Sequence, residues 1–324
     1  MGNSPLFDLE SSDADRLRVD EALMASVKTP DAYLTEIASH LLLAGGKRLR
    51  PMFSVVASQV AGGPTTEEAI QGGISCELVH LGSLYHDDVM DESPTRRGVE
   101  TVNAKWGNLQ AILAGDFLLA RASEIAASLG TEVAGLLART IGRLCEGQIE
   151  ELRHTYNVAR PLESYLSSIS GKTASLYSTA ARIGGLVSKF DRGLVNALTA
   201  YGEAFGMVFQ IVDDVLDLSA TDAQLGKPSG HDMVEGVYTL PVLYTLANGG
   251  VPASELADVL GKPLNVAERD KALSIVRSNG GIEAAIELAE MYVEAAEEAC
   301  QDLPNTAATV ALRFAPNALL ASVR

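Results

Sequence analysis

Two clusters of aspartates lie within apolar parts of this 324-residue sequence, each with the pattern DDxxD. The six carboxylates are Asp87, Asp88 and Asp91 in "HDDVMDESPTRRG" (86–98), and Asp213, Asp214 and Asp217 in "FQIVDDVLD" (209–217). The first and last aspartates of each cluster are four residues apart, so on a helix they share a face. Two negative charges about 5 Å apart repel by about 3 kcal/mol at an effective dielectric of about 20. A divalent cation removes that repulsion, and oxygen ligands with few nearby His or Cys residues favour Mg²⁺.

One DDxxD cluster alone is more often a solvated helix face than a metal site. Here both clusters follow apolar stretches, "ELVHLGSLY" and "AFGMVFQIV". Burial of carboxylates is costly unless a positive partner meets them. Two helices that face each other across a bundle core could bring the clusters together. The pair therefore favours a shared Mg²⁺ site.

Basic residues accompany these clusters. "GGKRLRP" (45–51) supplies Lys47, Arg48 and Arg50, and "TRRG" (95–98) supplies Arg96 and Arg97. The first segment lacks the GxxxxGK[ST] spacing of a nucleotide-binding loop, and no strand precedes it. Solvated turn charges are one interpretation, whereas diphosphate recognition by Arg forks and Lys charges is the other. Basic groups beside an Mg²⁺ cluster suggest two diphosphate sites, one bridged by metal and the other held by cations.

The elements that must position these residues are helices. Apolar residues recur at three- and four-residue spacing, which predicts helices over 65–92, ending near Pro94, and over 192–219. Gly- and Pro-rich breaks fall at 61–64, 157–161, 226–230, 248–252 and 261–264. No alternation of strands and helices appears, so the fold class is all-α. Both acidic clusters are then near helix C-termini, where the helix dipole disfavours negative charge.

Composition narrows the class further. Hydrophobic residues make up 47% of the chain, enough for a large core, and the formal net charge is −17. This acidic balance argues against non-specific binding of nucleic acid. No apolar run approaches the roughly 20 residues of a membrane span, and we see no signal peptide. Cys76, Cys145 and Cys300 are far apart in the sequence, which favours reduced thiols and a cytoplasmic protein.

Five segments occur in an order that resembles the trans-type polyprenyl (isoprenyl) diphosphate synthases. They are "GGKRLRP", "HDDVMDESPTRRG", "GKTASL", "FQIVDDVLD" and "GKPSGHDMVEGVYTLP", and the resemblance covers roughly residues 30–245. It implies one all-α domain over 1–324, a large helical bundle of the isoprenoid synthase type around a deep central cavity. It also implies a homodimer that joins isopentenyl diphosphate to an allylic diphosphate with Mg²⁺ as cofactor.

The resemblance assigns roles to individual residues. Mg²⁺ that bridges the allylic diphosphate would be bound by Asp87, Asp88 and Asp91, with Asp213, Asp214 and Asp217 facing them. The residues matched to isopentenyl diphosphate are Lys47, Arg50, His80 and Arg97. The residues matched to the allylic substrate are Arg96, Lys172, Thr173, Gln210 and Lys227. The resemblance also implies a set of catalytic residues, which are Asp87, Asp88, Asp91, Lys172, Asp213 and Asp214.

Some of these matches have plainer alternatives. His80 alone would more often be a core histidine, and Thr173 and Gln210 could simply cap or bridge helices. The sequence also departs from the family in one motif: Val237 stands where many relatives carry a second lysine. Lys227 would then carry the leaving-group contact alone, or another basic residue would substitute for the lysine.

The mechanism implied by the resemblance begins with ionisation of the allylic C–O bond, assisted by Mg²⁺ and cationic side chains. The double bond of isopentenyl diphosphate then attacks, and a proton is lost. Gly82 and Ser83, which precede Asp87 by five and four residues, are small, where short-chain relatives often carry aromatic residues. An open first turn predicts a product longer than farnesyl, formed from a farnesyl or geranylgeranyl primer. Close helix packing is the alternative reason for small residues, and the floor of the tunnel could lie near 115–122.

Several alternative functions remain. A geranylgeranyl diphosphate synthase would perform the same chemistry with a shorter product. A terpene cyclase usually pairs one DDxxD with a different metal motif, and a non-catalytic partner subunit tends to lose aspartates or cations, whereas this chain keeps both. A structural bundle would need no paired acidic clusters. A long apolar product could bring the protein to a membrane surface, although no strongly basic amphipathic helix demands it.

Overall fold

The structure, a computed structural model, describes residues 4–220 and 229–324. Through the second acidic cluster, the α-helices are α1 (Ser12–Ser26), α2 (Ala32–Leu43), α3 (Leu49–Ser58), α4 (Glu67–Met90), α5 (Val102–Trp106), α6 (Asn108–Ser128), α7 (Thr131–Arg153), α8 (Leu162–Ile169), α9 (Ser175–Val187) and α10 (Arg192–Ser219). After it come α12 (His231–Glu235), α13 (Leu240–Ala247), α14 (Gly250–Val259), α15 (Val266–Ser278), α16 (Gly281–Ala299) and α17 (Ala307–Leu320). The all-α prediction is confirmed.

The two helices predicted to carry the aspartates are present, with clear caps at their starts. In α4 the Thr66 side chain accepts a hydrogen bond from the Ala69 amide, and Glu67 lies in the first turn, where the helix dipole favours a carboxylate. In α10 the Asp191 side chain caps the amide of Leu194. These caps fix where the helices begin, and therefore which turns carry the acidic clusters.

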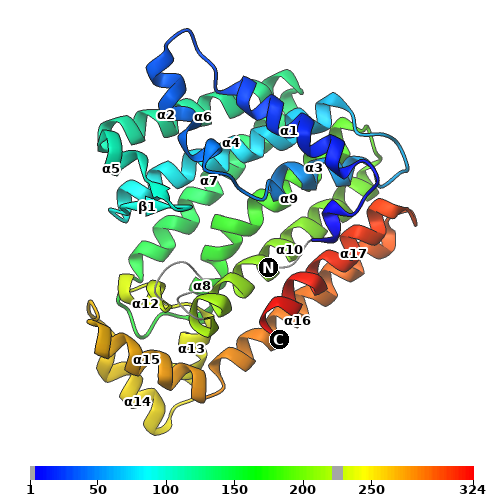
Figure 1. The fold of residues 1–324 in the computed structure, drawn as a ribbon. Helices are drawn as coiled ribbons and strands as arrows, with labels where there is room; N and C mark the ends of the chain where they lie inside the picture. The colour runs from blue at the N-terminus through cyan, green and yellow to red at the C-terminus, as the bar shows by residue number, and fades with distance from the viewer. Residues whose placement is uncertain (1–3, 221–228) are drawn as a thin grey trace.

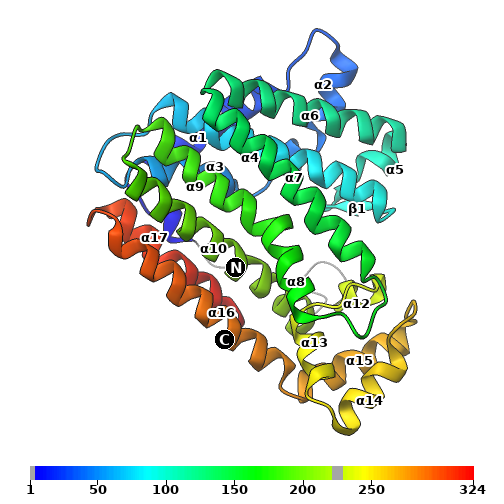
Figure 2. The same ribbon diagram turned by 180° about the vertical axis from the view of Figure 1, so that it is seen from behind.

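Helices α4 and α10 lie in the interior of the bundle. Helix α4 packs against α3, α6 and α9, while α10 packs against α9 and α16 (Figures 1 and 2). Two hydrophobic cores fill the molecule: one gathers most of α1–α9, and the other gathers α8 and α12–α16. Helix α10 contributes to both cores, with Phe205 in the first and Val212 in the second. The single domain over 1–324 stays a prediction, which the continuity of α10 through both cores supports.

A π-helical turn, η2 (Ser170–Ala174), connects α8 to α9. Helix α10 approaches this turn closely at Gly206, where a Cβ atom would lie only 2.4 Å from the Cα atom of Ala174. A residue with a side chain would therefore force the two segments apart. Single π-turns of this kind are frequent at functional sites because they turn side chains out of the helical repeat.

Beyond α4 the chain forms a small hairpin of β1 (Thr95–Arg96) and β2 (Val99–Glu100), paired antiparallel. Arg97 in its turn has φ of 52°, a left-handed conformation that is uncommon for a residue with a side chain. Three short 3₁₀ turns complete the described elements: η1 (Pro5–Phe7), η3 (Cys300–Asp302) and η4 (Ala321–Val323). None of the helices that the structure describes has the length and hydropathy needed to cross a bilayer.

Candidate active site

Carboxylates from both acidic clusters line one cavity of about 740 Å³, which we call the acidic cavity. Asp87 and Asp91 reach it from the end of α4, and Asp213 and Asp214 reach it from α10. Folding therefore brings together two segments that are far apart in the sequence, as the paired motifs predicted. Glu151, Asp232 and Glu235 line the same cavity, and carboxylate oxygens are ligands that hard cations prefer.

The second aspartate of the first cluster has a different setting. Asp88 is buried and does not belong to the cavity lining; its Oδ1 atom accepts a hydrogen bond from Nε of Arg96 at 2.5 Å. Its Oδ2 atom has no hydrogen-bond partner among the described residues. Because Arg96 itself lines the acidic cavity, Asp88 holds this guanidinium in place from behind.

The second cluster is held by neutral donors. The Tyr165 hydroxyl donates to Oδ2 of Asp214 at 2.5 Å, and Nε2 of Gln210 donates to Oδ1 at 2.8 Å. Thr173, on the π-turn, donates in turn to Oε1 of Gln210 at 2.7 Å. Thr173 and Gln210 thus form the helix bridge that was their plainer interpretation, and both also line the acidic cavity. The network fixes the position of Asp214.

Asp217, the last aspartate of the second cluster, is buried and lies outside the set of residues that lines the acidic cavity. Its main-chain carbonyl accepts hydrogen bonds from the Gly230 amide at 2.8 Å and from the Ser229 hydroxyl at 3.1 Å. These bonds tie the end of α10 to the start of α12. Lys227 lies outside the described residues.

Burial dominates the electrostatics of the aspartates. Desolvation raises the pKa of Asp87 against the lowering effects of Lys172 and Arg96. Desolvation, with the charges of Glu235 and Asp87, raises the pKa of Asp91 to about 6. The pKa of Asp214 is raised well above its usual range, first by burial and then by Asp232. Carboxylates that resist ionisation in this way gain from a positive partner.

Lys172 supplies positive charge beside the first cluster. Its Nζ atom forms an ion pair with Oε1 of Glu151 on α7 at 2.7 Å. Desolvation lowers the pKa of Lys172, but Glu151 and Asp87 outweigh it, so the pKa is raised and the amine stays charged. Glu151 was missed in the sequence because acidic residues such as Glu150 and Glu151 on a polar helix carry no motif. It positions the lysine.

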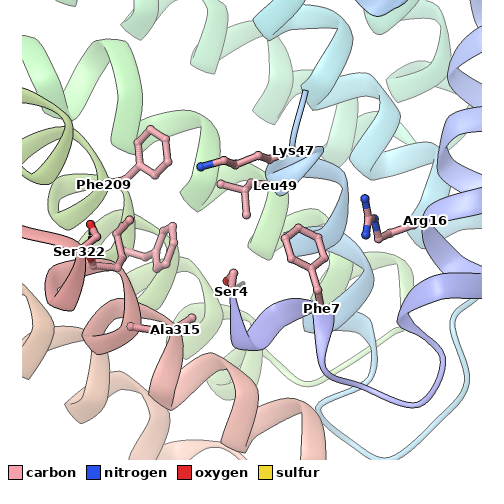
Figure 3. A pocket seen from close by; sticks show the side chains of 11 residues that line it. Ser4, Phe7, Arg16, Lys47, Leu49, Phe209, Ala315 and Ser322 are labelled. Carbon is pink, nitrogen blue, oxygen red and sulfur yellow. Dashed lines mark hydrogen bonds between the residues drawn. The ribbon is translucent and has the colours of Figure 1, made fainter. Parts of the chain in front are cut away.

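A second space, the cationic cleft of about 290 Å³, adjoins the acidic cavity. It is lined by residues that include Lys47, Arg50, His80, Arg97 and Asp213, and it shares Arg97 and Asp213 with the acidic cavity. All four residues matched to isopentenyl diphosphate therefore meet in one place. Figure 3 shows Lys47 extending from the start of α3 towards Phe209, across a smaller neighbouring cavity of about 210 Å³.

The cations of this cleft are held at fixed positions. The Arg50 guanidinium carbon lies 4.7 Å from the ring centroid of Tyr177. Burial, with the charges of Arg50 and Arg97, lowers the pKa of His80 well below its usual range, so its imidazole is neutral at pH 7. Arg48 instead is buried in ion pairs with Asp20 at 3.0 Å and Glu77 at 3.4 Å, a structural role.

A third space of about 530 Å³, the apolar cavity, opens from the same centre between α4 and α7. Its apolar lining includes Leu84, Met90, Leu144, Ile149, Leu152 and Phe209, and it shares Asp87 and Lys172 with the acidic cavity. Ser83 lines it, whereas Gly82 faces α6, where a Cβ atom would lie 3.0 Å from the Gly115 carbonyl oxygen. Ser83 is thus placed beside the cavity, and Gly82 serves the close helix packing that was its alternative.

Two further residues of the acidic cavity were not singled out in the sequence. Tyr165 and Arg160 lie on and just before α8, in a segment that reads only as a break in the helical pattern. Val237, the residue at which the last motif departs from the family pattern expected above, also lines this cavity. Neither Arg160 nor Tyr165 belongs to a recognisable motif, so only the folded chain brings them to the carboxylates.

Comparison with known proteins gives concordant matches. A sequence model described as polyprenyl synthetase matches residues 31–276. The chain is 38% identical to the nonaprenyl diphosphate synthase of Mycobacterium tuberculosis, over 89% of this chain and 86% of that one. It is 39% identical to the heptaprenyl diphosphate synthase component 2 of Geobacillus stearothermophilus, over 92% and 93% of the two chains.

Among solved structures, the chain is similar to a polyprenyl synthase from Caulobacter crescentus CB15 complexed with calcium and isoprenyl diphosphate. The TM-score is 0.91 at 31% identity, covering 99% of this chain and 97% of the other. The likeness thus extends over the entire bundle that positions the acidic cavity.

Proposed function

We propose that this chain is a trans-polyprenyl diphosphate synthase. It belongs to the polyprenyl synthetase family. It joins isopentenyl diphosphate head to tail to an allylic diphosphate, and repeats the step to give a long-chain polyprenyl diphosphate. The observation that carries this proposal is the junction of three spaces at one point. An acidic cavity, a cationic cleft and an apolar cavity share residues of α4 and α10.

Each space fits one part of the reaction. The cationic cleft offers Lys47, Arg50 and Arg97 to the diphosphate of isopentenyl diphosphate. In the acidic cavity, Lys172 and Arg96 are placed to meet the oxygens of the allylic diphosphate as negative charge develops on them. Phe209, which lines the cationic cleft and the apolar cavity, lies where the two substrates would meet and helps to exclude water.

We infer that the divalent ion is Mg²⁺. Among the described residues, no three acidic, His or Cys side chains converge closely enough to hold an ion by themselves. This accords with Mg²⁺, which usually keeps water and is bound through one or two carboxylates plus substrate phosphates. Asp87 and Asp91 would hold it from α4, and Asp213 and Asp214 from α10. Bound Mg²⁺ would neutralise negative charge on the leaving diphosphate.

The apolar cavity supports a long product because its first turn beside Asp87 is open. Ser83→Phe should fill the cavity at that turn and shift products to shorter lengths with little change in thermal stability. Gly82→Phe is the matched control: its ring would meet the backbone of α6, so it should destabilise the fold. Product lengths from the Ser83→Phe enzyme that equal those of the wild type would contradict the assignment of Ser83.

We further propose a homodimer through α6 and α7. Leu109, Ile112 and Leu113 form an exposed apolar stripe at helical spacing on α6, which packs against α7. Leu113→Glu should convert a dimer into monomers in light scattering after size exclusion. A wild-type protein that is monomeric at micromolar concentration would refute this dimer.

All three cysteines are free thiols, which supports a cytoplasmic location.

A second candidate is a catalytic subunit that works only with a partner. The observation that favours it is the 39% identity to a protein named as component 2 of a heptaprenyl diphosphate synthase. Both acidic clusters and the cationic residues of the cleft are present in this chain, so the second candidate concerns dependence on a partner rather than loss of the site.

The decisive experiment incubates the purified chain with MgCl₂, labelled isopentenyl diphosphate and farnesyl or geranylgeranyl diphosphate, and resolves the products by length. Long products that vanish with EDTA and with Asp87→Ala, but persist with the exposed Asp258→Ala, are expected. Products that stop at geranylgeranyl would indicate a shorter-chain synthase. A folded protein that elongates none of several primers would indicate partner dependence.

A further inference from the structure

Arg160 is a cation with unused hydrogen-bonding capacity in the wall of the acidic cavity. The residue lies in the loop between α7 and α8 and is 5% exposed. Its Nη1 atom donates to the carbonyl oxygen of Tyr238 at 3.3 Å, and its guanidinium carbon lies 5.6 Å from the ring centroid of Tyr165. Nε and Nη2 are buried and have no hydrogen-bond partner among the described residues.

The two unused donors are adjacent ones. In arginine, Nε–H and one Nη2–H point the same way and form a planar fork that matches two oxygens of a carboxylate or phosphate group. Leaving both donors buried without an acceptor is costly, because each has lost its hydrogen bond to water. Nη1 and the Tyr165 ring hold the group in place, so the unused edge is ready for an acceptor that the protein itself does not supply.

The surroundings indicate which acceptor fits. Arg160 lines the acidic cavity together with Asp87, Asp214 and Lys172. The main-chain carbonyl that anchors it belongs to Tyr238, the residue after Val237, and Val237 lines the same cavity. This part of the wall is thus apolar at position 237 and positively charged at position 160.

We propose that Arg160 is a substrate-binding residue whose Nε and Nη2 donate to two oxygens of the allylic diphosphate in the acidic cavity. This deepens the proposed function and rests on it. The guanidinium provides, from the α7–α8 loop, the positive charge that Val237 lacks. Because the allylic diphosphate is also the leaving group, Arg160 contributes both to primer affinity and to charge stabilisation during its departure.

The test substitutes Arg160→Met, which keeps most of the side-chain volume and removes the fork. We expect the KM for farnesyl diphosphate to rise about 10- to 100-fold, the range for loss of hydrogen bonds to a charged group. The KM for isopentenyl diphosphate should stay within about twofold, because its predicted residues line the cationic cleft. Arg153→Met is the matched control: this exposed arginine at the end of α7 pairs with Glu150, and its loss should change neither constant.

A rescue variant separates binding from a structural role. In the Arg160→Met background, Val237→Lys would place an ammonium in the same part of the cavity, and we expect it to recover at least tenfold of the lost primer affinity. Arg160→Lys should give an intermediate KM for farnesyl diphosphate. It replaces Arg160→Met as the test variant if Arg160→Met fails to fold. A merely structural Arg160 would lower the melting temperature, and Val237→Lys would not restore the KM.

A direct binding measurement distinguishes failure of this inference from failure of the proposed function. Isothermal titration of inorganic diphosphate in the presence of MgCl₂ should show about tenfold weaker binding to Arg160→Met than to the wild type. That result supports the inference even if the wild type condenses no prenyl substrate. Equal diphosphate affinity, together with an unchanged primer KM in a folded Arg160→Met protein, would overturn it.

Discussion

The two acidic clusters have the same DDxxD pattern but different structures. On α4 the first and last aspartates line the acidic cavity, and the middle one, Asp88, is turned away against a cation. On α10 the first two aspartates line the cavity, while Asp217 is buried and lies outside its lining. A shared motif therefore fixes which residue types are present, and the approach of each helix decides what each carboxylate does.

The partners differ as well. Asp88 is held by the charged guanidinium of Arg96, whereas Asp214 is held by the neutral donors Tyr165 and Gln210. A cation compensates a buried carboxylate directly, while neutral donors leave more of the desolvation cost in place. Burial still raises the pKa of both carboxyl groups, so Arg96 offsets only part of the desolvation of Asp88.

The largest expected effect separates Asp87 from its neighbour Asp88. Asp87→Asn should reduce kcat/KM about 1000-fold, because it removes a carboxylate aimed into the cavity where charge develops. Its stability should not fall, because burial raises the pKa of this carboxyl and, unlike Asp88, it forms no ion pair among the described residues. Steady-state kinetics and thermal melting measure the two effects. Equal kinetic losses in Asp87→Asn and Asp88→Asn would remove the functional distinction between them.

Asp88→Asn should show the opposite balance. It leaves the half-buried Arg96 without its anionic partner, so we expect the free energy of unfolding to fall by about 1–3 kcal/mol. Activity should fall about tenfold, through loss of the fixed position of Arg96 rather than loss of a cavity carboxylate. Denaturant unfolding monitored by circular dichroism measures the stability. An Asp88→Asn protein as stable as Asp87→Asn would contradict the buried ion pair.

The sequence predicted the helices better than the directions of their side chains. The helices around both clusters could be predicted because apolar periodicity runs over many turns. The caps formed by Thr66 and Asp191 became clear only in the structure. The spacing of Asp213 and Asp217 predicted a shared face. It could not predict that Asp217 would be buried outside the cavity lining, because that depends on long-range packing, such as the contact of its carbonyl with Ser229 and Gly230.

Long-range contacts account for most of what the sequence did not reveal. Tyr165 bonds to Asp214, and Arg160 bonds to the Tyr238 carbonyl. These partners are about 50 to 80 residues away in the chain, so no local motif could reveal them. Gly82 illustrates the same limit within one motif. Its small size predicted an open tunnel, yet its Cα faces the backbone of α6, and helical phase alone could not reveal which neighbour lay there.

The smallest expected effect tests the neutral donors of the second cluster. Tyr165→Phe removes the hydroxyl that donates to Asp214, so this buried carboxyl keeps only the bond from Gln210, and we expect the free energy of unfolding to fall by about 1–2 kcal/mol. Tyr177→Phe is the matched control. Tyr177 is equally buried, but its hydroxyl has no hydrogen-bond partner among the described residues, so its loss should be neutral or slightly stabilising. Equal destabilisation by the two substitutions in urea unfolding would mean that the Tyr165–Asp214 hydrogen bond adds nothing to stability beyond the packing of the ring.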